Sequence, residues 1–258
     1  MNPGFAKNSI RRVDAAIIRT PVLEAVAPGR ITLVCTTRGK DVARVAKRPQ
    51  IETLTLTSAE VGDAHQLEPY ASVELVRLTD VDLSGRDLSG LELSRCRLTS
   101  VSLDDTDLTG ARLVETRLEG INAPRMSMPR SFIRQVEICA SRVGALDLFE
   151  SRIRSLVVDS AKIELANFRG SDVRDVLFRG CIIGELDLVD ATVARMAFED
   201  CTVTTLDVHQ ATLSDVDLRG LDIGTIHHLD GLRGCTIDGE QALGLTGHFA
   251  AHLGIVID

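Results

Sequence analysis

Every fifth residue in the central part of this chain is apolar, and this period limits the possible folds more than any other feature of the sequence. The series runs from Val73 to Leu118 and from Ile133 to Ile223, with Ala123 and Met128 at the two intervening positions. A period of five is neither the 3.6 of an α-helix nor the 2.0 of a single strand. A chain that repeats it this often is predicted to coil many times around one core.

Each five-residue unit is predicted to place two side chains inside and three outside. A second inward residue stands two positions before many repeat centres, as at Leu91, Cys96 and Val101. The remaining positions are polar, and an aspartate often directly precedes the repeat centre. Many units end in glycine, which suits a corner where the backbone turns. These corner glycines are Gly85, Gly90, Gly110, Gly120, Gly170, Gly180 and Gly220.

The inner residues also follow a 20-residue period. Four columns of inner residues alternate between small and large side chains, so opposite faces match in size. One column contains Ser131, Ser151, Ser171, Ala191 and Ala211, and the next contains Val136, Leu156, Val176, Met196 and Val216. This alternation predicts four faces and 20 residues per coil. At about 4.8 Å per coil, the usual strand spacing, the repeats would form a rod roughly 35 Å long.

These repeats resemble those of the pentapeptide repeat family, whose consensus is Ala, Asp or Asn, Leu or Phe, and two variable residues. The unit Ala166-Asn167-Phe168-Arg169-Gly170 matches it in full, and the resemblance covers residues 73–226. It implies an all-β solenoid, a right-handed quadrilateral β-helix with four pentapeptides per coil. The bulky Leu146, Leu186 and Leu206 depart from the usual alanine.

The size pattern changes phase between Ile121 and Ser131. Val81, Val101 and Ile121 are large in a column that is later small, and Pro124 and Pro129 lie in the intervening stretch. Proline cannot donate a hydrogen bond to a strand ladder. We therefore expect residues 122–130 to leave the coil as a loop. The alternative is a distorted coil with Met126 and Met128 still pointing inward.

The two ends lack the five-residue period. Residues 1–72 are expected to form an N-terminal α/β cap of strand–helix units. Residues 227–258 are expected to form a C-terminal helical cap, with a helix over 240–253 that has Asp238 as its N-cap and ends at Gly254. Leu243, Phe249, Ala250 and Leu253 would cover the last coil. The expected N-terminal strands are Ile31–Cys35, Thr53–Thr57 and Glu74–Leu78, and the helices are Asp41–Arg48 and Ala59–Gln66. Leu232–Ile237 is expected to add a last coil fragment, and Ile255–Ile257 a short strand.

The charge and composition exclude several classes of protein. The whole chain has a net charge of −8, and residues 73–226 carry 26 acidic against 18 basic residues. Direct binding to nucleic acid needs clustered Lys and Arg, so we do not expect it. We find neither a signal peptide nor an apolar run of about 20 residues, the length that spans a membrane. We expect a cytoplasmic protein whose scattered cysteines are thiols, with Cys181 and Cys201 one coil apart.

No residue pattern indicates an enzyme, a metal or a cofactor. His248 and His252 are spaced i, i+4 on the terminal helix, without a supporting carboxylate or cysteine, so a polar helix face explains them. We interpret His227-His228-Asp230 as a turn. The cluster Asp104-Asp105-Asp107 resembles a calcium loop only superficially, because its aspartates occupy outward positions of the repeat.

We therefore expect a non-enzymatic protein-interaction scaffold. In one alternative, implied by acidic family members that protect gyrase from quinolones, the chain is a DNA mimic that binds a type II topoisomerase. An acidic surface and a projecting loop would contact the partner, and the C-terminal end would form a homodimer. The acidic surface residues are Asp104, Asp105, Asp107, Asp187, Asp207 and Asp217, and the loop residues are Arg125, Met126, Met128 and Arg130.

Overall fold

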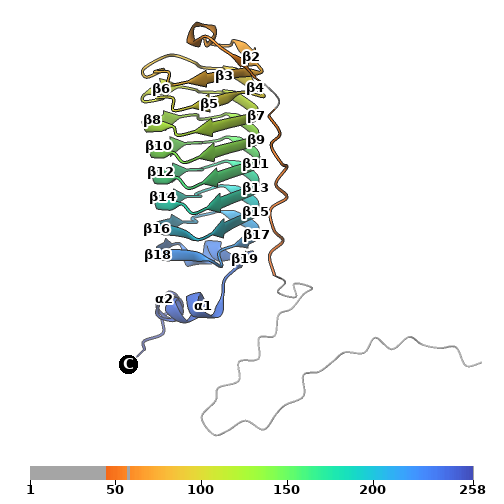
Figure 1. Ribbon diagram of the computed structural model, residues 1–258. Helices are drawn as coiled ribbons and strands as arrows, with labels where there is room; N and C mark the ends of the chain where they lie inside the picture. The colour runs from red at the N-terminus through yellow and green to blue at the C-terminus, as the bar shows by residue number, and fades with distance from the viewer. Residues whose placement is uncertain (1–44, 57–58, 258) are drawn as a thin grey trace, which may run out of the picture. The chain divides into compact units, whose positions relative to one another are not determined.

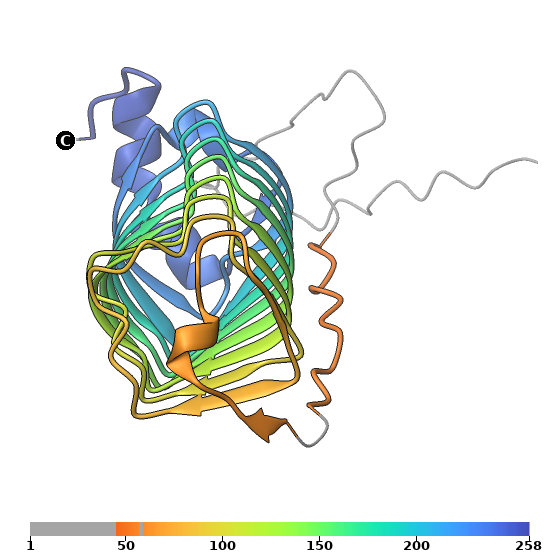
Figure 2. The same ribbon diagram turned by 90° about the horizontal axis from the view of Figure 1, so that it is seen from above.

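The computed structural model describes residues 45–56 and 59–257, which belong to one compact unit, Arg44–Asp258. Residues 60–237 form a parallel β-solenoid of about nine turns, shown from the side in Figure 1 and along its axis in Figure 2. The predicted all-β solenoid is confirmed.

The strands form two parallel sheets in the described part of the chain. The first contains β1 (Glu60–Val61), β2 (Ser72–Glu74), β3 (Val76–Thr79), β4 (Glu92–Ser94), β5 (Arg97–Thr99), β7 (Arg112–Glu119), β9 (Phe132–Cys139), β11 (Arg152–Asp159), β13 (Asp172–Arg179), β15 (Thr192–Glu199), β17 (Thr212–Asp217) and β19 (Cys235–Thr236). The second contains β6 (Thr106–Asp107), β8 (Asn122–Ser127), β10 (Arg142–Asp147), β12 (Lys162–Asn167), β14 (Ile182–Asp187), β16 (Cys201–Asp207) and β18 (Leu221–His227).

The strand register confirms the 20-residue coil. Arg112 pairs with Phe132, and Arg152 pairs with Asp172. The inner residues of both columns are buried except for the half-buried Ala211, and Phe168, Val173 and Phe178 are completely inaccessible to solvent. All seven corner glycines have positive φ, between +56° and +78°. The sequence pattern therefore identified the core and these corners correctly.

For the surface we define four faces by the coil 131–150. Face 1 is 131–135, face 2 is 136–140, face 3 is 141–145 and face 4 is 146–150, each together with its equivalents at 20-residue intervals. The last residues of faces 1, 2 and 4 have positive φ in this coil, at Gln135, Ala140 and Glu150. The chain crosses from face 3 to face 4 within β10.

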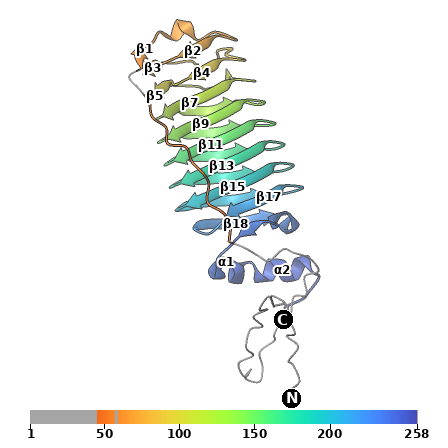
Figure 3. The same cartoon turned by 90° about the vertical axis from the view of Figure 1, so that its right-hand side faces the viewer.

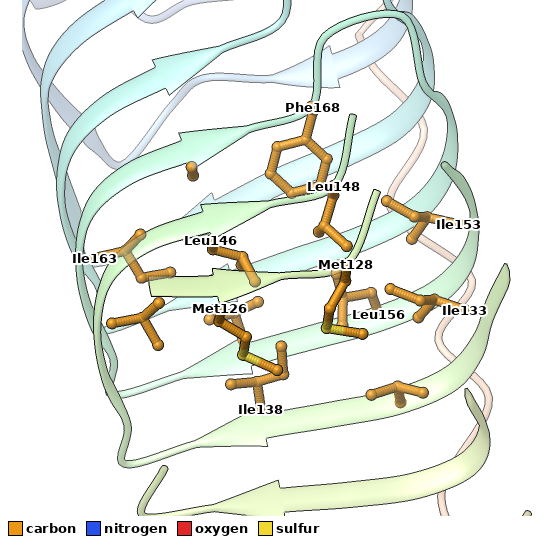
Figure 4. Close-up of a cluster of buried hydrophobic side chains, with 14 of the residues drawn as sticks. Met126, Met128, Ile133, Ile138, Leu146, Leu148, Ile153, Leu156, Ile163 and Phe168 are labelled. Atoms are coloured by element: carbon orange, nitrogen blue, oxygen red, sulfur yellow. The ribbon is translucent and has the colours of Figure 1, made fainter. Parts of the chain in front are cut away.

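The expected loop at 122–130 is wrong. Its residues form β8, which pairs with β6 on one side and β10 on the other. Met126 and Met128 are 1% exposed and point into the core (Figure 4). Pro124 is tolerated because the ladder skips its position, since Ala123 pairs with Val143 and Arg125 with Ala145.

The phase change in side-chain size therefore needs no insertion. In one coil face 2 contributes the small Thr116 and face 3 the large Ile121, whereas two coils later face 2 contributes Leu156 and face 3 Ala161. All four are buried. The volume lost on one face is regained on its neighbour in the same layer, which keeps the core filled.

The expected strand–helix units are not formed in the described N-terminal residues. Residues 45–56, here called the strap, contain neither helix nor strand, which contradicts the helix over 41–48 and the strand over 53–57 as far as both are described. Of the helix over 59–66 only a 3-10 turn, η1 (Ala64–Gln66), is present. The strand over 74–78 is interrupted at Leu75, which has a φ of 56°. The strand Ile31–Cys35 lies outside the described residues.

The first coil is closed by side chains that the sequence pattern did not single out. Leu67, 1% exposed, belongs to the core cluster. Arg86 stands at an inner repeat position, where its guanidinium donates to the carbonyl oxygens of Ala64 and Leu67 at 3.0 and 2.5 Å. The Leu67 carbonyl thereby gains a partner at the end of the solenoid, where no further coil is available, and the Ala64 carbonyl, which already accepts from Leu67 N–H at 3.2 Å, gains a second donor.

The C-terminal end follows the prediction in part. β19 forms the expected last fragment, followed by α1 (Gly239–Gly244) and α2 (Thr246–His252), and His228 precedes the 3-10 turn η2 (Leu229–Leu232). Asp238 is the N-cap, with a capping box to Gln241, and Gly254 has positive φ. The predicted cover is wrong for Leu243 and Leu253, which are 77% and 71% exposed. Residues 255–257 form no strand.

The side chain of Gln241 attaches this cap. Its Nε2 donates to the carbonyl oxygens of Leu218 and Leu221 at 2.7 and 2.8 Å. The cap is therefore held by hydrogen bonds to the edge of the coil rather than by the leucines that the helical pattern suggested.

Candidate interaction surface

The aspartates that precede the repeat centres on face 4 hold the corners of the coil. Each accepts a hydrogen bond from the backbone N–H two residues further on, an Asx turn. These bonds run to Asp87 from Ser89, to Asp107 from Thr109, to Asp147 from Phe149, to Asp187 from Val189 and to Asp207 from His209, at 2.8–3.1 Å. The acidity of this face thus follows partly from the way the corner is built.

Faces 1 and 2 are nearly neutral because acidic and basic side chains alternate there. Over residues 72–219 their outward positions carry 13 acidic and 12 basic side chains. Many of these form ion pairs between coils, as Arg97 does with Glu119 at 2.7 Å and Arg195 with Asp175 at 2.6 Å. Each exposed pair adds little stability, but together they cancel the local charge.

Faces 3 and 4 are acidic. Over residues 82–225 their outward positions carry 13 acidic and five basic side chains, a net charge of −8. The acidic residues are Asp82, Asp87, Asp104, Asp105, Asp107, Asp147, Glu150, Glu164, Glu185, Asp187, Asp190, Asp207 and Asp222, and the basic ones are Arg125, Arg130, Arg142, Lys162 and Arg169. The negative charge of the solenoid is therefore concentrated on two adjacent faces.

Five of the six predicted acidic residues lie on faces 3 and 4, although not all are free. Asp105 pairs with Arg125 at 3.0 Å, and Asp187 is only 7% exposed and pairs with Arg169. Asp217 lies on face 2. There the hydrogen bond from Arg219 lowers the pKa of its carboxyl, so Asp217 does not belong to the acidic surface.

Two of the four predicted loop residues cannot contact a partner. Met126 and Met128 fill the core, whereas Arg125 and Arg130 are exposed, on faces 3 and 4 respectively. Sequence reasoning missed Glu164, Glu185 and Asp190, which are exposed on the same two faces. Sorting the outward residues by the 20-residue period, as was done for the inner ones, would have found them.

The histidines and cysteines that the structure describes do not come together in a metal site. Among residues 45–56 and 59–257, no group of three or more His, Cys, Asp or Glu side chains is arranged to hold a metal ion. His248 and His252 are exposed on α2, and His228 Nδ1 lies 3.0 Å from Asp207 on face 4. The hydrogen bond with Cys201 and burial raise the pKa of the Cys181 thiol. No helix in the described part of the chain is long and apolar enough to cross a membrane.

Comparison with known proteins agrees with the coil geometry. The family model for pentapeptide repeats matches residues 77–122 with eight copies. Residues 77–122 of this chain are therefore pentapeptide repeats. The match lies in the part of the solenoid where every unit follows the five-residue period, and the register of 20 carries the same coil onward to β18.

No curated protein matches the sequence. Two solved structures that match part of this chain are QnrB1, a plasmid-mediated fluoroquinolone resistance protein, and HetL, a pentapeptide repeat protein involved in heterocyst differentiation regulation from the cyanobacterium Nostoc. Trypsin-treated QnrB1 is 13% identical, with a TM-score of 0.33, and the match covers 70% of this chain and 98% of QnrB1. HetL is 16% identical, with a TM-score of 0.26, and the match covers 61% of this chain and 85% of HetL. These similarities are too low to indicate a function.

Proposed function

We propose that this pentapeptide repeat protein is a non-enzymatic cytoplasmic scaffold that binds a basic partner protein through faces 3 and 4. The observation that supports this is the unequal charge, 13 acidic against five basic side chains on these faces and 13 against 12 on the other two. Regular strands hold the acidic side chains in fixed columns about 4.8 Å apart. A preorganised row of like charges attracts an oppositely charged surface and speeds association.

The charge density favours a partner that otherwise binds DNA. From Asp82 to Asp222 is seven coil steps, or about 34 Å, so a net charge of −8 corresponds to one charge per about 4 Å. Duplex DNA carries one charge per about 1.7 Å of its axis, and a protein on one side of it meets roughly half of these, one per about 3.4 Å. A type II topoisomerase such as gyrase is the specific candidate, with the solenoid occupying its DNA-binding surface and protecting it from quinolone-type inhibitors.

A gyrase supercoiling assay with and without a quinolone tests this candidate. We expect added protein to compete with DNA or to relieve inhibition by the quinolone. The double variant Glu164→Lys/Glu185→Lys should lose the effect, because it reverses two exposed charges on face 3. The matched control Glu60→Lys/Glu92→Lys makes the same change in charge outside faces 3 and 4 and should retain it. Equal behaviour of the two variants would refute a role for the acidic faces.

The broader scaffold proposal is tested by displacement of labelled duplex DNA from basic DNA-binding proteins, measured by fluorescence anisotropy. Displacement should weaken as salt rises, because the charges are exposed and screened. If no protein of such a panel binds at low salt, the acidic faces are not a binding surface for this class of partner.

The exposed apolar side chains at the C-terminus favour a homodimer through that end. Leu243, Leu253, Ile255, Val256 and Ile257 are all at least 56% exposed. Sedimentation at several concentrations should show association that Leu253→Asp/Val256→Asp abolishes. A wild-type chain that remains monomeric throughout would contradict it.

A further inference from the structure

The strap runs along the solenoid in an extended line, across the coils rather than around them (Figures 1 and 3). Its hydrogen bonds step through the coils in reverse order. Ala46 N–H donates to Thr236 Oγ1 at 2.9 Å, Lys47 N–H to Asp215 at 3.2 Å, Gln50 N–H to Asp175 at 2.7 Å and Glu52 N–H to Ser155 at 3.0 Å, while Gln135 Nε2 donates to the Thr53 carbonyl oxygen at 2.9 Å. The eight strap residues 46–53 thus reach across about five coils.

Four of the five solenoid side chains that hold the strap form one column, and Thr236 lies outside it. Gln135, Ser155, Asp175 and Asp215 are 20 or 40 residues apart, and all have φ between 54° and 58° at the corner of faces 1 and 2. Arg195 fills the remaining position and binds both carboxylate oxygens of Asp175 at 2.6 Å. We call these five residues the track.

The track binds the strap through its backbone. Each of the five hydrogen bonds above uses a strap N–H or C=O group, so this part of the recognition does not depend on which residues the strap carries. The track therefore has the properties of a site for an extended peptide, because such a peptide has unpaired backbone groups at a regular spacing.

An apolar stripe lies beside the track. Val157, Leu177 and Ala197 are cross-strand neighbours at outward positions of face 2, two residues after track positions, and all three are half-buried. Ile51 and Leu54 of the strap are half-buried as well. Outward apolar side chains in adjacent coils offer a continuous surface that favours a peptide with spaced apolar residues.

The charge around the track also indicates the chemistry of its ligand. The strap carries Lys47 and Arg48 where it meets Asp215, and the positive charge of Arg48 contributes to lowering the pKa of Asp217. A ligand with a basic pair followed by apolar residues would therefore match this surface from end to end.

We propose that the track and its apolar stripe are a binding site for an extended peptide of a partner protein, and that the strap occupies this site in cis. The matching partner segment is extended, basic at its N-terminal end and apolar further on, with free N–H groups at the positions equivalent to Gln50 and Glu52. A tethered segment has an effective concentration in the range of about 1 mM, so a partner binds fully only when the strap is displaced. This site is on faces 1 and 2 and does not depend on the function proposed for faces 3 and 4.

The test uses the full chain with Gln50→Pro/Glu52→Pro. These substitutions remove two N–H donors of the strap and leave every track residue intact. Release of the strap is measured as faster trypsin cleavage after Lys47. Binding of a fluorescent peptide with the wild-type sequence of residues 45–56 is then measured by anisotropy for the wild-type and double-variant proteins.

We expect faster cleavage and at least tenfold tighter peptide binding for the double variant than for the wild-type chain. A peptide with proline at the same two positions should bind neither protein, and Ser155→Ala in the double variant should weaken binding of the wild-type peptide. Unchanged cleavage would show that backbone hydrogen bonds do not hold the strap, and a released chain that binds no peptide would show that the track is not a peptide site. A wild-type dimer that the proline substitutions dissociate would overturn the proposal in favour of strap exchange between two copies.

Discussion

Replacement of Phe178 tests the packing of the core most directly. Its side chain is completely buried, stacked on Phe198 with ring centroids 5.2 Å apart and an interplanar angle of 8°, and edge-on to Phe168 at 6.3 Å. Phe178→Ala removes a buried ring, which costs about 3–5 kcal/mol. Two aromatic contacts of about 0.5–1.5 kcal/mol each place the expected loss towards the upper end of that range.

Urea unfolding followed by far-ultraviolet circular dichroism is the suitable assay, because the chain has no tryptophan and its single tyrosine, Tyr70, is 80% exposed. Solenoids can unfold in stages, so the midpoint and slope of each transition should be compared. Ile182→Ala is the matched control, since Ile182 is an outward residue that is 57% exposed, and it should cost less than about 0.5 kcal/mol. If Phe178→Ala costs no more than Ile182→Ala, the inward register is wrong.

Two further predictions concern a corner and an ion pair. Gly144→Ala should destabilise the solenoid by about 1–3 kcal/mol in the same urea assay, because a Cβ at this position would lie 2.3 Å from the Pro124 carbonyl oxygen. Gly244→Ala is the control, because a Cβ at Gly244 would meet only open space. A Gly144→Ala protein as stable as wild type would mean that the coils are further apart at this corner. Asp217→Asn should be less stable than wild type at neutral pH, because the hydrogen bond from Arg219 lowers the pKa of Asp217 in the folded state. This stabilisation is complete above the unfolded pKa of about 3.9 and is lost as pH falls through the lower folded pKa. The stabilities of the wild-type and Asp217→Asn proteins should therefore converge on acidification. A constant difference in stability from pH 7 to pH 2 would contradict the role given to the Asp217–Arg219 ion pair.

The two prolines show why the expected loop was wrong. Pro124 occupies the one position of β8 that the ladder skips, so no hydrogen bond is lost there. Pro129 occupies the position that donates to an aspartate in other coils, and its own coil has Ser127 in place of that aspartate. A proline disrupts a strand only where its N–H is needed, and this depends on the exact path of the coil.

The N-terminal residues illustrate a different limit. The apolar residues of the strap suggested strands and helices, because sequence patterns assume that a segment satisfies its own backbone groups or pairs with a sheet. Here the donors are satisfied instead by Asp215, Asp175 and Ser155 of the solenoid. Contacts between residues 103 to 168 positions apart leave no periodic signal in the sequence.

The sequence alone was sufficient for the solenoid, its four faces and almost every core position, because in a repeat fold each inner side chain packs on its equivalents one coil away and the same choice recurs every five residues. Only the tertiary structure showed that Arg86 and Gln241 close the two ends of the solenoid. It also decided where the strap lies and which carboxylates remain unpaired. These features depend on single, long-range contacts at places where the repeat stops or on faces that the core does not constrain. The five-residue period therefore determines the core of this protein but says least about the surface on which the proposed functions depend.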